Sequence, residues 1–207
     1  MLPPIKPIMS ITDNRPICPP TDARFSIPML DPRIAALGLT RVPNSADGDC
    51  ALESALMATS ADPCTLPEKS VVQKLRVRCT ELVKDLLVRG DLETKEILRI
   101  QFCHASDPGI NDEDLEAMTV KSASDWAVDH SKDGCYADSL MLMALCSVLD
   151  ISIRLVTEVP EWRDGSLIIK GLDQSRLSSS TKVVIFAYFG LKFKVTWSGI
   201  FLFSTYI

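Results

Sequence analysis

The chain has 207 residues, of which 46% are hydrophobic and 24% charged, and its formal net charge is −5. This length suffices for one well-packed core and is short for two domains, so we expect one globular domain with a tail. Because an acidic chain repels phosphate backbones, nucleic acid is excluded as the expected partner.

The seven cysteines are odd in number and form no Cys-x-x-Cys pair, which favours a reduced intracellular protein, cytoplasmic or nuclear. Prolines interrupt the start, MLPPIKPIMS, where a secretory signal needs an unbroken apolar run, so we expect no signal peptide. The most apolar segment, 183–207, is interrupted by Lys192 and Lys194, so it predicts paired strands and no membrane span.

Eight of the thirteen prolines precede residue 33, which predicts an irregular, proline-rich arm over 1–30 and a domain over 31–207. Asp31-Pro32 and Gly38 bracket a short helix. Further helices are predicted from Asp49, over 69–90, 91–102, 112–129 and 138–149. The helix over 138–149 is apolar nearly all round, which places it at the centre of the core.

Beta-branched and aromatic runs follow these helices and predict strands over 151–158, 166–170, 182–189 and 191–197, the last two forming a hairpin around Gly190. Helices first and strands after indicate an α+β fold, a small central sheet flanked by helices.

The stretch SADGDCALESALM places Cys50 in the first turn of a helix. The positive end of the helix dipole and nearby N–H groups favour thiolate over thiol. Gly48 permits a sharp turn that brings N–H groups toward whatever Cys50 attacks, as an oxyanion hole requires. The alternative is that Cys50 is a small buried hydrophobic residue beneath the helix.

Asp-Gly-Asp-Cys followed by a helix of small apolar residues resembles the nucleophile motif of the ovarian-tumour (OTU) family of cysteine deubiquitinases. WAVDHSKDGCYADSLMLMALCSVLDISIRLV and KVVIFAYFG are similar to later segments of that family, so the likeness spans roughly residues 34–190. The resemblance implies an OTU-like cysteine protease fold. It also implies that Cys50 is the nucleophile and that Asp47, with the backbone of Gly48 and Asp49, shapes the oxyanion site.

The family's catalytic histidine and its orienting acid would fall just after KVVIFAYFG, where this chain has Lys192 and Lys194. A lysine is protonated at pH 7, so it cannot accept the thiol proton without a large fall in its pKa. We therefore expect impaired hydrolysis. The run from Leu191 onward also departs from the family pattern, which predicts an atypical C-terminal end.

His104 and His130 are the two histidines of the chain and the remaining substitute bases, although each is more simply a partly exposed residue without a family counterpart. The spacing of Asp47, Asp49 and Glu53 superficially resembles a calcium loop, but this segment lacks the loop's glycine and its later glutamate. We therefore expect no metal and no cofactor. The resemblance implies a deubiquitinase domain, expected to be monomeric, whose partner is ubiquitin or a ubiquitin-like protein. The alternative is a catalytically silent ubiquitin-binding or protein-interaction module on the same fold.

Overall fold

A computed structural model of the chain describes residues 36, 40–42, 48–62, 65–102, 112–157, 168–172, 182–190 and 197–203. In chain order the elements are β1 (Thr40–Val42), α2 (Cys50–Thr59), α3 (Lys69–Arg89), α4 (Leu92–Phe102), α5 (Asp112–His130), α6 (Ser139–Leu149), β2 (Ile151–Thr157), β3 (Ile168–Ile169), β4 (Lys182–Gly190) and β5 (Trp197–Phe203). The predicted α+β class is confirmed, since helices dominate the first part and strands the last.

The strands form one mixed sheet in the order β1-β5-β4-β2-β3. Strands β2 and β4 are parallel, and the other three pairings are antiparallel. The runs predicted at 151–158, 166–170 and 182–189 each contain a strand. β1 lies in the LGLTRVP segment just before the cysteine motif, so the sheet joins that segment to the C-terminal part of the chain.

The strand that pairs with β4 lies later in the sequence than the predicted run 191–197. Of that run only Trp197 belongs to the described part, and there it begins β5, with Gly190 opposite Trp197 in the register. The antiparallel pairing of β4 with β5 fits the predicted hairpin. Residues 191–196 of that run lie outside the described residues, and the strand paired with β4 there is WSGIFLF.

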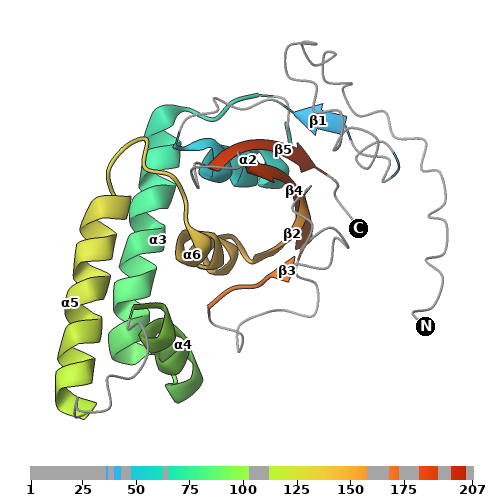
Figure 1. Cartoon of the computed structure of the whole chain (residues 1–207). Helices are drawn as coiled ribbons and strands as arrows, with labels where there is room; N and C mark the ends of the chain where they lie inside the picture. The colour runs from blue at the N-terminus through green and yellow to red at the C-terminus, as the bar shows by residue number, and fades with distance from the viewer. Residues whose placement is uncertain are drawn as a thin grey trace, which may run out of the picture.

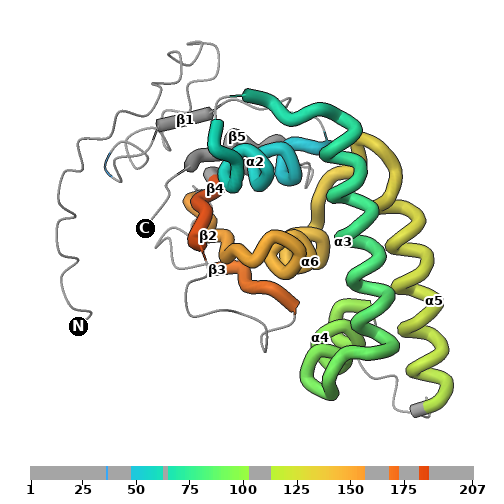
Figure 2. The backbone as a smooth tube through the Cα atoms, turned by 180° about the vertical axis from the view of Figure 1, so that it is seen from behind, coloured from blue at the N-terminus to red at the C-terminus, as the bar shows by residue number. Residues whose placement is uncertain are grey.

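Helix α6 occupies the centre of the molecule, as its all-round apolar sequence predicts. Figure 1 shows it between the long helix α3 and the sheet, and the opposite view in Figure 2 agrees. Its buried residues are Leu140, Met141, Leu142, Ala144, Leu145 and Cys146. Asp150 ends it with left-handed backbone, φ 51°, and leads directly into β2.

Helix α3 is amphipathic as predicted and ends at Arg89, just before Gly90. In both views α5 runs alongside it, and α4 lies at the same end of the pair (Figures 1 and 2). The buried side of α3 comprises Val72, Leu75, Arg76, Cys79, Thr80, Val83 and Leu86. Helices α3, α4 and α5 together form a layer on one side of α6 (Figures 1 and 2).

The proline-rich arm over 1–30 lies outside the described residues, and of the short helix expected after Asp31 only Ala36 is described. Within the described ranges, no helix is both long and apolar enough to cross a membrane.

Candidate functional site around Cys50

Helix α2 begins at Cys50, so the prediction that this cysteine stands in the first turn of a helix is confirmed. The helix is surrounded by protein, and eight of its ten residues are buried: Cys50, Ala51, Leu52, Glu53, Ser54, Ala55, Met57 and Ala58. Cys50 itself is 2% exposed and belongs to the main hydrophobic cluster. A reagent or substrate therefore reaches the sulfur only when the residues that cover it open locally.

The turn before Cys50 is in direct backbone contact with the loop that joins α5 to α6. A Cβ atom built on Gly48 would lie 1.7 Å from the Gly134 carbonyl oxygen and 2.8 Å from the Cys135 carbonyl carbon. No side chain fits at that distance, so glycine is required here by close approach rather than by its dihedral angles. The structure thus joins the two segments that carry the family resemblance.

Arg76, near the middle of α3, holds this turn from inside the protein. Its side chain is fully buried and its Nη2 donates to the Gly48 carbonyl oxygen at 3.1 Å and to the Asp49 carboxylate at 2.5 Å. Its Nη1 donates to the His130 carbonyl oxygen at the end of α5, at 3.0 Å. One guanidinium therefore links α3, the turn before Cys50 and the end of α5.

His130 lies in a second polar cluster beside this guanidinium. Its ring stacks on Trp126 with centroids 4.6 Å apart, Nδ1 lies 3.0 Å from the Trp126 carbonyl oxygen, and Nε2 lies 3.3 Å from the Asp138 carboxylate. Asp138 also accepts from the indole N–H of Trp126 at 2.8 Å and caps α6 by accepting from the Met141 N–H at 2.8 Å. Both ring nitrogens face acceptors, an arrangement that the doubly protonated imidazolium satisfies.

The pKa of His130 is raised above its usual value. Burial and the charge of Arg76 oppose the protonated form, but the hydrogen bond and negative charge of Asp138 and the Trp126 carbonyl outweigh them. The pKa of Asp138 is lowered: burial opposes its charge, and the hydrogen bonds from His130, Met141 and Trp126 outweigh burial. The His130 ring is thus held by Trp126 and Asp138, and it could accept the thiol proton only after leaving these partners.

This pairing predicts a pH-dependent stability. The folded-state pKa of His130 is raised. The stability that its ion pair contributes is therefore fully present below the unfolded-state pKa of about 6.5, and it is lost as pH rises through the folded-state pKa. We expect His130→Gln to lower the free energy of unfolding by about 1 kcal/mol at pH 5.5, and by less at pH 8.5, in urea titrations.

Asp138→Asn is the matched control, because asparagine still caps α6 but carries no charge to pair with His130. Asp138→Asn should remove the same pH-dependent part of the free energy of unfolding as His130→Gln. Equal losses at both pH values for His130→Gln would show that the ring stabilises the fold through packing alone.

Several predicted site residues lie outside the described residues: Asp47, His104, Lys192 and Lys194. The structure brings Gly48, Asp49 and Cys50 together with the His130 backbone through Arg76, which sequence reasoning missed. A signal for it existed, since Arg76 interrupts the apolar stripe of Val72, Cys79 and Val83 on α3. Lone charges in such a stripe are buried only when they are paired.

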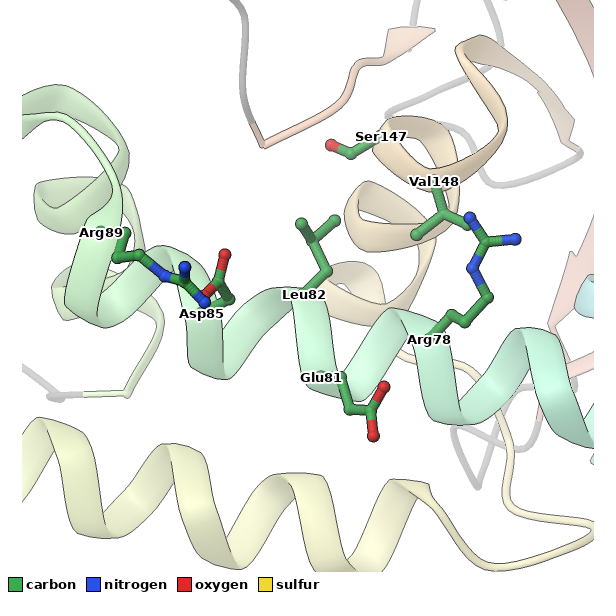
Figure 3. A pocket seen from close by; sticks show the side chains of 7 residues that line it. All are labelled: Arg78, Glu81, Leu82, Asp85, Arg89, Ser147 and Val148. Carbon is green, nitrogen blue, oxygen red and sulfur yellow. The ribbon is translucent and has the colours of Figure 1, made fainter.

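A groove of about 580 Å³ lies elsewhere, between α3 and the end of α6. Its described lining is Arg78, Glu81, Leu82, Asp85, Arg89, Ser147 and Val148 (Figure 3). Cys50, Asp49 and His130 are not in that lining. Across the part of the chain that the structure describes, no group of three His, Cys, Asp or Glu residues is placed to hold a metal ion.

Neither a family model nor a curated protein matches the sequence. Solved structures do match the fold. "Structure of OTUD1 OTU domain" aligns with a TM-score of 0.52 at 14% identity, covering 85% of this chain and 93% of that one. "Structure of Ovarian Tumor (OTU) domain in complex with Ubiquitin" aligns with a TM-score of 0.44 at 15% identity, covering 81% of this chain and 69% of that one. The first of these likenesses shows that the chain has the α+β fold of OTU domains.

Proposed function

We propose that this chain is an OTU-type thiol hydrolase domain that acts slowly on the isopeptide bond linking ubiquitin, or a ubiquitin-like protein, to lysine. The observation that carries the proposal is the position of Cys50. On an OTU-like fold, it is the first residue of α2 and directly follows a glycine turn held by a buried guanidinium. Helix N-terminal N–H groups and a held turn are what a thiolate and an oxyanion need.

The reaction begins when the Cys50 sulfur attacks the isopeptide carbonyl carbon and a C–S bond forms. Its carbonyl oxygen becomes an oxyanion, which the N–H groups of the turn stabilise, with Asp47 helping to shape this site. The C–N bond then breaks, and the leaving lysine amine takes up from water the proton that the Cys50 thiol lost to water. Water hydrolyses the resulting thioester, which restores the thiol and releases a carboxylate.

Slow turnover follows from the proton-transfer groups. Lys192 and Lys194 stand in the sequence where the family has its histidine and orienting acid. An ammonium group cannot accept the thiol proton at pH 7. The His130 ring is committed to Asp138 and Trp126, so it does not supply the missing imidazole.

A second candidate is a catalytically silent module that binds ubiquitin or another protein on the same fold. The observation that favours it is the burial of Cys50, which is 2% exposed among apolar neighbours. In that case Gly48, Cys50 and Arg76 act only as packing elements.

Ubiquitin bearing a C-terminal electrophile separates the two functions. We expect the purified chain to form a covalent adduct, seen as a mass increase of one ubiquitin, and Cys50→Ala to form none. Cys135→Ala is the matched control, since Cys135 lies in the contacting loop and is partly exposed. Binding of ubiquitin without adduct formation would support the silent module and contradict the hydrolase.

A second assay tests the expectation of slow turnover. Hydrolysis of ubiquitin carrying a C-terminal fluorogenic amide should be slow for the chain as it stands. It should rise by about 10²-fold in Lys192→His if the missing base limits the rate. An unchanged rate in a variant that still forms the adduct would place the limitation elsewhere.

A further inference from the structure

The side chain of Arg76 has a more specific arrangement than a buried ion pair requires. Asp49 alone would neutralise its charge, yet Nη2 also binds the Gly48 carbonyl oxygen, two residues before Cys50. The other terminal nitrogen binds the His130 carbonyl oxygen, so rotation of the planar guanidinium is fixed at both ends. The turn is thereby held to two helices that come from distant parts of the sequence.

This bond to the Gly48 carbonyl determines the direction of the next peptide N–H. The described residues contain no cis peptide bond, and in a trans peptide the C=O and N–H point in opposite directions. Because the Gly48 carbonyl points at Arg76, the Asp49 N–H in the same peptide plane points away from Arg76. Loss of this hydrogen bond would free the peptide plane to rotate and redirect its N–H.

The Asp49 side chain does not cap α2. Asp49 precedes α2 with φ −90° and ψ −8°, and its side chain accepts no capping hydrogen bond from the helix. Asp138 precedes α6 with φ −88° and ψ −175°, and its carboxylate does accept from the Met141 N–H. The same residue type therefore caps α6, whereas before α2 its carboxylate binds the guanidinium instead of the first-turn N–H groups.

We propose that Arg76 is a positioning residue for the Cys50 site: its hydrogen bond to the Gly48 carbonyl aims the Asp49 N–H at the oxyanion, and its ion pair keeps the Asp49 carboxylate away from the N–H groups of the first turn of α2. This inference rests on the proposed function, because it assigns Arg76 to the oxyanion site of the same thiol. Arg76 touches no reacting atom itself.

Two small reagents separate this role from thiol reactivity in general. With p-nitrophenyl acetate, the Cys50 thiolate attacks the acetyl carbon, an oxyanion forms, and the C–O bond breaks to release nitrophenolate, leaving a thioester. Nitrophenolate leaves without a proton, so the missing histidine does not affect this step. With iodoacetamide, sulfur displaces iodide directly and no oxyanion forms. The ratio of the two rates at Cys50, followed by peptide mass spectrometry, therefore reports oxyanion stabilisation.

Arg76→Lys keeps the positive charge and removes the planar fork, so we expect this ratio to fall at least about tenfold, since loss of a whole oxyanion donor lowers rates by about 10²–10³. Arg78→Lys is the matched control on the exposed side of the same helix (Figure 3) and should leave the ratio unchanged. A folded Arg76→Lys whose ratio stays within twofold of the parent would overturn the proposal, as would a parent whose Cys50 reacts with neither reagent.

Asp49→Asn decides the question if Arg76→Lys does not fold at the assay temperature, as judged by circular dichroism. Asparagine still offers Arg76 an acceptor and leaves the Gly48 bond in place, so the ratio should stay within about threefold of the parent. A tenfold fall in this variant would show that the Asp49 charge, and not the orientation of the peptide, controls the site. Neither reagent involves ubiquitin. A preserved effect of Arg76 without adduct formation by the ubiquitin probe would therefore refute only the proposed function.

Discussion

Replacing Arg76 with alanine is expected to lower the free energy of unfolding by about 3–5 kcal/mol. The Arg76 side chain is fully buried and the Asp49 side chain is 4% exposed. The variant would therefore remove the guanidinium from a buried carboxylate, and removal of one member of a buried ion pair lowers stability by this amount. The Gly48 and His130 carbonyls would also lose their donor. Urea denaturation of both proteins at pH 7 measures the difference.

The control is Arg78→Ala, two residues further along α3, whose side chain is exposed in the groove of Figure 3. Its effect should stay within about 0.5 kcal/mol, as for most surface substitutions. The double variant Arg76→Ala with Asp49→Ala should be less destabilised than the sum of the single variants, because neither charge is then left alone. A loss below about 1 kcal/mol for Arg76→Ala, or strict additivity, would contradict the ion pair as described.

The helices could be predicted from the sequence because each carries a local signal. An apolar stripe marks α3, and an all-round apolar surface marks α6, so both the elements and the central place of α6 followed from residue spacing. Cys50 at the start of α2 was equally local, since the Asp-Gly-Asp turn precedes a run of small apolar residues. These predictions needed no knowledge of tertiary contacts.

What the sequence did not reveal depends on partners that are distant in the chain. Arg76 interrupts the apolar stripe of α3, but its partners are known only once the fold places the Gly48 and His130 carbonyls around it. His130, expected to be a surface residue, is partly exposed: its side chain, stacked on Trp126 and bonded to Asp138, is 16% exposed.

The second large expected effect concerns the reactivity of the cysteines. Cys79 and Cys146 are fully buried in the core, and burial raises the pKa of each thiol to about 12. The thiolate is the nucleophile, so at pH 7.5 both should be nearly inert. Cys50 is also buried, but it stands at the positive end of α2 beside a guanidinium-held turn, and we expect the residues that cover it to open locally while the turn stays held. We expect it to react with iodoacetamide at least about a hundredfold faster than Cys79 or Cys146.

The central claim is that Cys50 is a poised nucleophile and not a small residue packed under a helix. Its most direct test is a time course of iodoacetamide labelling of the native chain, with each cysteine quantified by peptide mass spectrometry. Rapid labelling of Cys50 while Cys79 and Cys146 stay unmodified is the result that the proposed function predicts. Labelling of Cys50 only as slowly as Cys79 and Cys146, at the rate of global unfolding, would contradict it.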